Sequence, residues 1–153
     1  MIKINVITNN IKWLRYIKKP NNYLNRKLSK LNSKNKEFKK NNIFCTLLLS
    51  NNKEIKHLNK KFRKKNKATD ILSFPFQKKK ELKKKLINSS EIYLGDIIIN
   101  FKKMNTVSKK DFEKHFNILW VHGLIHLFGY DHKKDFNYKK MKLIEIKLLK
   151  KII

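Results

Sequence analysis

The chain has 153 residues, and its 39 Lys and Arg residues outnumber its 11 Asp and Glu residues, giving a formal net charge of +28. The length suits one domain over 1–153, and 41% apolar residues are too many for a disordered basic tail. No apolar run reaches the roughly 18–20 residues that cross a bilayer, and the chain starts without a secretory signal, so we expect no membrane partner. The single cysteine, Cys45, cannot form an internal disulfide, which fits a reducing cytoplasm.

The net charge is weak evidence for nucleic-acid binding when it is taken alone. Basic proteins often bind polyanions, because neutralising phosphates releases condensed counterions. Only three of the 39 basic residues are arginines, however, and the chain is rich in Lys, Asn and Ile, the residues that A+T-rich coding sequences favour. We therefore take the evidence for function from motifs and not from charge.

The first half of the chain predicts two strands and two or three helices. Residues 2–8 alternate apolar and polar side chains, as a half-buried strand does. Helical spacing of apolar residues predicts one or two helices over 10–32, with Pro20 as a break. The continuous apolar run at 43–49 indicates a buried strand, and a short helix should follow at 52–62.

The second half predicts two more strands and two more helices. Strands are expected at 70–76 and 92–99, and the charge-rich segment 78–85 between them is expected to form a solvated loop or hairpin extension. Helical patterns follow at 108–128 and 136–152. Because strands and helices mix without strict alternation, α+β is the expected fold class.

The long helix over 108–128 carries signals at both of its ends. Ser108 can serve as N-cap, with Asp111 three residues later in the arrangement of a capping box. Gly129 is well placed to end the helix, because the residue after a helix often needs a left-handed backbone. The pair Gly95 and Asp96 is expected to form a bend or bulge in the last strand.

Three of the five histidines lie within eleven residues, at His122, His126 and His132. On a helix His122 and His126 project from the same side, one turn apart, so both rings can reach one ion at roughly 2.0–2.1 Å. A chain reversal at Gly129 could bring His132 to the same ion. Three neutral imidazoles with an open fourth position are the ligand set of a catalytic zinc.

A pair of histidines four residues apart is often accidental, and the third histidine is what favours a metal site. The chain has only three glycines, and two of them, Gly123 and Gly129, lie within this cluster. His115 is roughly 10 Å from His122 along a helix axis, too far to share an ion. His57 has no metal-ligating residue nearby in the sequence, so we expect both to be surface or packing residues.

The spacing of the three histidines, with a glycine between the second and third, matches the metzincin proteases, H-E-x-x-H-x-x-G-x-x-H. Those proteases use the glutamate after the first histidine as general base. Here that position is Gly123. Peptide hydrolysis by that mechanism is therefore disfavoured, and a proton acceptor would have to come from elsewhere.

The string at 122–132 resembles the signature of the YbeY family, H-G-x-L-H-L-x-G-Y-D-H. Residues 58–63 and 69–75 resemble the family's L-N-x-x-Y-R and T-D-V-L-S-F-P, and residues 94–99 resemble its L-G-D-I-V-I. This sequence departs from the family where Phe62 replaces the usual tyrosine and Ala68 the usual proline. The family comprises bacterial metal-dependent endoribonucleases that take part in rRNA maturation and ribosome quality control.

The resemblance implies a zincin-like α+β domain, with a mixed, roughly four-stranded sheet and a metal-binding helix that ends at a glycine turn. It implies one Zn²⁺ per chain, bound by His122, His126 and His132, and it makes Arg63 the functional arginine. The implied activity is single-strand-specific cleavage of rRNA precursors, at the three-prime end of the small-subunit rRNA. The ribosome or its small subunit is then the implied partner.

The residues leave several roles open. A guanidinium such as that of Arg63 can hold phosphate oxygens in a bidentate fork and oppose the charge of a phosphoryl transition state. The alternative interpretation is that Arg63 is a surface cation in a basic helix. Asp131 could orient a ligand imidazole or cap the turn. The nucleophile could be water or a 2′-hydroxyl. Two other functions also remain: a metal-dependent hydrolase with a non-RNA substrate, and a non-catalytic ribosome-assembly factor stabilised by metal.

Overall fold

The computed structural model describes residues 1–8, 10–34, 40–132 and 135–153. Its centre is a four-stranded sheet with the order β1-β2-β4-β3. The strands are β1 Ile2–Thr8, β2 Asn42–Ser50, β3 Ile71–Pro75 and β4 Glu91–Asn100. β1, β2 and β4 are parallel, and β3 pairs antiparallel with β4 at one edge. The expected mixed, four-stranded sheet is confirmed.

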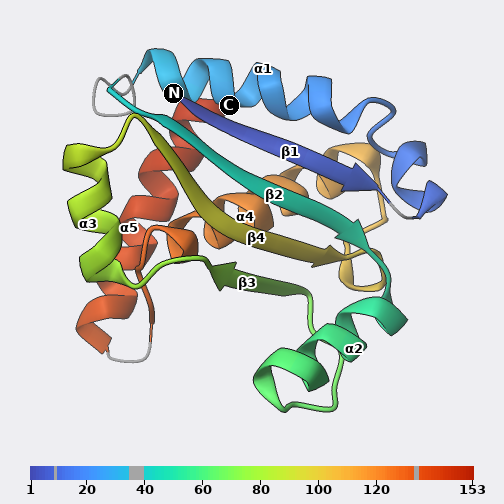
Figure 1. Ribbon diagram of the computed structural model, residues 1–153. Helices are drawn as coiled ribbons and strands as arrows, with labels where there is room; N and C mark the ends of the chain where they lie inside the picture. The colour runs from blue at the N-terminus through green and yellow to red at the C-terminus, as the bar shows by residue number, and fades with distance from the viewer. Residues whose placement is uncertain (9, 35–39, 133–134) are drawn as a thin grey trace.

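Five α-helices within the described residues surround the sheet (Figure 1). They are α1 Pro20–Ser33, α2 Asn52–Arg63, α3 Lys79–Asn88, α4 Lys109–Leu127 and α5 Asp135–Ile152. Two short 3-10 helices, η1 Ile11–Arg15 and η3 Phe101–Lys103, connect elements. None of these helices combines the length and the apolar character that crossing a membrane requires. The α+β class is confirmed, with helices and strands mixed as expected.

The main core lies between one face of the sheet and the helices α1, α4 and α5. Alternate residues of β1 and β2 point into it, as the period of two in their sequences predicts. Trp13 and Trp120 are both fully buried there, and the Trp13 indole donates to the Ser50 carbonyl at 3.0 Å. On the opposite face, Ile55 of α2 packs with Leu72 and Ile98 in a smaller cluster.

The segment 10–32 differs in detail from its prediction. Two helices form, as one of the expected alternatives had it, and Pro20 is the first residue of the second, α1, where the missing N–H of a proline costs nothing. The first turn is the separate helix η1, in which Trp13 is buried while Ile11 and Leu14 are exposed. The expected apolar face therefore holds for α1 and for Ile17, but not for Ile11 and Leu14.

The solvated loop or hairpin expected at 78–85 is wrong, because these residues begin the helix α3. Lysine is a good helix former, so a run of lysines does not oppose a helix when a few contacts anchor it. Here Leu82 is buried, and the Glu81 carboxylate accepts a hydrogen bond from the Lys78 backbone N–H at 3.4 Å. Leu86 of the same helix, partly buried, also packs against the main core, so α3 has apolar contacts as well as a cap.

The helix α4 approaches the sheet unusually closely at Gly123. A Cβ added at this position would lie 2.8 Å from Ile97 Cγ2, 3.1 Å from Ile71 Cδ1 and 3.1 Å from Ser73 Oγ. These atoms belong to β3 and β4, so the missing side chain allows the helix backbone to pack directly on both strands. This contact sets the distance between α4 and the β3 edge of the sheet.

We expect Gly123→Ala to lower the free energy of unfolding. Alanine favours a helix over glycine by about 1 kcal/mol, but forcing a methyl group into this packed contact costs about 1–3 kcal/mol. Denaturant unfolding should show the decrease, and in an Ile97→Ala background the same substitution should instead be neutral or stabilising. An increase in stability in the native background would contradict the close contact.

Candidate metal centre

The helix α4 begins after Ser108 and ends before the turn at Gly129, as the sequence predicts. Ser108 Oγ accepts a hydrogen bond from the Asp111 N–H at 3.0 Å and caps the first turn. After Leu127 the chain reverses at Gly129, whose φ of +85° is strained for residues with a side chain. An added Cβ there would also lie 3.0 Å from Lys79 Cγ of α3. The reversal returns His132 toward the helix.

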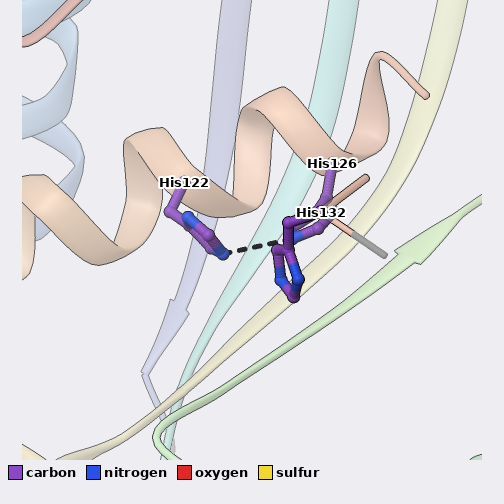
Figure 2. A group of neighbouring side chains, drawn as sticks. All are labelled: His122, His126 and His132. Carbon is purple, nitrogen blue, oxygen red and sulfur yellow. Dashed lines mark hydrogen bonds between the residues drawn. The ribbon is translucent and has the colours of Figure 1, made fainter. Parts of the chain in front are cut away.

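The three histidine side chains converge on one point (Figure 2). His122 and His126 extend from one face of α4, and their Nε2 atoms lie 3.1 Å apart. Each of the three residues offers a ring nitrogen, and these nitrogens all lie within 4.8 Å of one another. His122 and His126 are partly buried and His132 is exposed, so the cluster has a protected side and an open side.

The Nδ1 atoms of His122 and His126 point away from the cluster, and each lies beside an acceptor that fixes the ring proton on Nδ1. His122 Nδ1 lies 2.9 Å from the Glu145 carboxylate, and His126 Nδ1 lies 2.9 Å from the Tyr130 carbonyl oxygen. A carbonyl oxygen can only accept, so His126 Nδ1 carries the proton. An ionised carboxylate likewise accepts from His122 Nδ1. In the neutral rings the lone pairs are therefore on Nε2 and face each other.

Burial and hydrogen bonds hold His126 neutral and Glu145 ionised. It lowers the pKa of the His126 imidazole to about 4, and the neighbouring His122 contributes to this lowering, so His126 is neutral at pH 7. Burial alone would raise the pKa of the Glu145 carboxyl, but hydrogen bonds from Lys142 and His122 outweigh it and hold this pKa below its ordinary value. Lys142 Nζ lies 2.6 Å from Glu145.

Two facing lone pairs repel unless a cation lies between them. Tetrahedral Zn²⁺ with nitrogen ligands at roughly 2.0–2.1 Å separates those nitrogens by about 3.3 Å, close to the 3.1 Å between His122 and His126. His132 supplies a third imidazole from the open side. The donor set therefore fits one divalent ion of the kind that imidazole binds, with room for a further ligand.

Arg63 lies at the same cavity, although it is far from the histidines in the sequence. It is the last residue of α2, and its Nη2 donates to the Ser73 carbonyl of β3 at 2.9 Å. Its guanidinium also lies over the Phe74 ring, 5.6 Å from the centroid. The cavity, of about 890 Å³, is lined by Arg63 together with the three histidines and Glu145.

The remaining predicted residues have other environments. Asp131 lines the cavity, and its carboxylate accepts from Asn137 Nδ2 at 3.3 Å. His115 Nδ1 accepts from the Asn105 backbone N–H at 3.1 Å, and His57 is exposed on α2, so neither belongs to the cluster. Gly95 lies at a register shift between β2 and β4, as the expected bulge requires.

Glu145 is a site residue that the sequence analysis missed. It is only 4% exposed on α5 and is separated from His122 by 23 residues in the sequence. The available signal was its position: it lies between Met141 and Ile152 on the buried stripe of a helix in which half of the exposed positions are lysines. A carboxylate on a buried face needs a partner, and that need points to a nearby polar site.

Comparison with known proteins gives a consistent result for the whole chain. A model of the family described as "Endoribonuclease YbeY" matches residues 7–153. The chain belongs to the YbeY endoribonuclease family. The Endoribonuclease YbeY of Pelagibacter ubique is 43% identical over 92% of this chain and 90% of that protein. The Endoribonuclease YbeY of Ehrlichia canis is 36% identical over 99% of this chain and 93% of that protein.

The fold agrees with a solved structure. The solution structure of TM1509 from Thermotoga maritima superposes with a TM-score of 0.55 and 25% sequence identity, covering 99% of this chain and 89% of that one. Together with the sheet and the histidine cluster on α4, this match confirms the expected fold, and the family model and the relatives confirm the family. The resemblance carried by the histidine string was therefore correct.

We expect Glu145→Leu to weaken Zn²⁺ binding by about 10–100-fold, because the substitution removes the acceptor that orients the His122 ring. Glu145→Gln keeps an acceptor oxygen and should cost less. Competition with a chromophoric chelator measures the affinity, and Glu91→Leu, at an exposed strand position, is the control. If the Glu145→Leu variant binds Zn²⁺ as tightly as the native chain, Glu145 does not support the site.

Proposed function

We propose that this chain is a metal-dependent endoribonuclease specific for single-stranded RNA. In this proposal His122, His126 and His132 bind one Zn²⁺, and Arg63 is the catalytic arginine. The observation that supports it best is the shared cavity, in which three converging imidazoles and one guanidinium meet, in a chain of the YbeY family. The proposal takes residues 1–153 as one domain.

The ion, when bound, would supply a Lewis acid at the cleaved phosphate. Arg63 binds the same phosphate: one of its Nη atoms is held by the Ser73 carbonyl, so the guanidinium is oriented before substrate arrives. Its other donors can then hold phosphate oxygens and oppose the negative charge that grows in the transition state. Lys65 and Lys142 also line the cavity and add positive charge at its walls.

Glu145 and the Tyr130 carbonyl act on the imidazoles and not on the substrate. Each accepts a hydrogen bond from an Nδ1–H and so keeps Nε2 of His122 and of His126 free to bind the ion. The Lys142 ammonium keeps Glu145 ionised. These groups hold the two helical imidazoles in the orientation that the site requires.

The cellular substrate that we propose is precursor rRNA, cleaved at the three-prime end of the small-subunit rRNA, with the ribosome or its small subunit as partner in the cytoplasm. The support is the family to which the chain belongs. A hydrolase with a non-RNA substrate and a ribosome-assembly factor with a structural metal remain the competing functions, and the two experiments below separate them.

Purified protein loaded with Zn²⁺ should cleave single-stranded RNA and lose that activity on chelation. His122→Ala should abolish cleavage, and Arg63→Ala should lower kcat by about 10²–10³-fold, as loss of one charge-stabilising donor does. Arg63→Lys should also be impaired, because lysine lacks the fork geometry. Arg26→Ala, on the distant helix α1, is the matched control. Cleavage of esters or peptides with RNA untouched would favour the non-RNA hydrolase.

Replacing the chromosomal gene by one that carries Arg63→Ala should cause small-subunit rRNA with an unprocessed three-prime end to accumulate, which sequencing of rRNA ends would measure. Arg63 does not bind the ion in our proposal, so this variant should keep its metal. Normal rRNA ends in the Arg63→Ala strain, combined with a loss of thermal stability on metal removal, would instead support the assembly factor.

A further inference from the structure

Three aromatic side chains form a continuous row on the face of the sheet that points away from the main core. Phe44 of β2 and Tyr93 of β4 are partners in the strand register, and their ring centroids lie 5.5 Å apart. Phe76, directly after β3, lies 5.5 Å from Tyr93 on its other side. Phe44 is 40% exposed and Phe76 is 66% exposed. We call these three residues the aromatic row.

In the part of the chain that the structure describes, the aromatic row is not packed under a helix. The helices α1, α4 and α5 pack on the opposite face, and Figure 1 shows α4 and α5 behind the sheet. The helix α2 covers the face that bears the row only at the far ends of the strands, where Ile55 contacts Leu72 and Ile98. A contiguous exposed apolar patch with polar residues around it is typical of a binding surface.

The aromatic row begins at the candidate metal centre. Phe76 lines a cavity of about 620 Å³ together with Arg63, His126 and Tyr130. From there the row runs across β4 to β2, away from the histidines. A ligand that occupies the metal site and continues past the β3 edge would therefore meet Phe76 first, then Tyr93 and Phe44.

Charges of both signs surround the aromatic row. Lys3 is opposite Phe44 in the register, and Lys79 lines the cavity beside Phe76. Among the acidic groups, Asp96 accepts a hydrogen bond from the Tyr93 hydroxyl at 2.5 Å, and Glu81 and Glu91 lie nearby in the sequence. The main property of this face is therefore its flat aromatic rings and not an attraction for phosphate. Every nucleobase can stack on such rings.

We propose that the aromatic row binds unpaired bases of single-stranded RNA next to the phosphate that is cleaved. This inference rests on the proposed function, and it adds the part of the protein that holds the flanking nucleotides. Bases within a duplex are stacked on each other and cannot lie on protein rings. Stacking on Phe76, Tyr93 and Phe44 thus supplies a physical reason for a preference for single strands.

A stable protein interface fits this face less well. The three aromatic side chains together offer roughly 600 Å² even when each is fully exposed, at roughly 200 Å² per side chain. This total is less than the roughly 800 Å² per partner that a standard interface buries. The side chains that flank the rings are polar or charged, including Lys3 and Asp96. The row is therefore better suited to a few stacked bases than to a second copy of the chain.

The test uses the Zn²⁺-loaded protein and a fluorescein-labelled, 2′-O-methylated single-stranded 12-mer that resists cleavage. Fluorescence anisotropy should show Kd rising about tenfold for Phe76→Ala and more for the triple alanine variant. Tyr93→Phe keeps the ring and should bind as the native chain does. Phe136→Ala removes an exposed aromatic ring of the same type from α5 and is the matched control.

A second arm links the rings to the bases. A 12-mer with abasic sites beside the cleavage position should bind the native chain about tenfold more weakly, and it should bind the triple variant with no further loss. On cleavable RNA the triple variant should show raised KM with kcat within about twofold of the native value, because the rings do not touch the reacting phosphate. Binding of a 12-base-pair duplex should not change.

The outcomes separate this inference from the proposed function. If the native protein cleaves RNA while the triple variant binds the 12-mer within about twofold of the native Kd, the aromatic row does not bind bases, and the proposed function stands. If the native protein neither cleaves nor binds RNA, both proposals are wrong. Unchanged RNA binding with loss of self-association in sedimentation would make the row a protein interface and overturn the inference.

Discussion

The close contact between α4 and the sheet at Gly123 is the constraint on which the candidate site depends. His122 immediately precedes this glycine, and the atoms that leave no room for a Cβ belong to Ile71, Ser73 and Ile97. Ser73 is also the residue whose carbonyl holds Arg63. One packing contact therefore fixes the separation between the helical imidazoles and the guanidinium, two groups that come from distant parts of the sequence.

The fold arranges the three histidines as a ligand set that fits a metal ion. Protons on the outer nitrogens are held by the Tyr130 carbonyl and the Glu145 carboxylate, so the inner nitrogens present lone pairs at short distance. The folded chain thereby holds two Nε2 lone pairs close enough to repel each other, and a cation bound between them would remove this repulsion. This arrangement needs three elements, namely α4, the turn after it and α5, which explains why the helix alone would not suffice.

Much of this structure could be predicted from sequence, because local rules governed it. The caps of α4, the reversal at Gly129 and the histidine spacing all follow from short-range geometry, and the family string placed Arg63 at the same site. The position of Glu145 against His122 could not be predicted, because it depends on how α5 packs across the site. The helix α3 was missed because a lysine run suggests solvent, while Leu82 and Leu86 pack against the main core and a cap supports the first turn.

The contact between Lys79 and Gly129 has a consequence for how the protein could be altered. The segment that joins β3 to β4 looks like a spacer in the sequence, yet its first helical residue rests on the chain reversal that carries His132. Lengthening this connection, or inserting a tag or a foreign loop at its start, would therefore disturb the third imidazole from outside the site. Engineers seeking a permissive insertion point should avoid it.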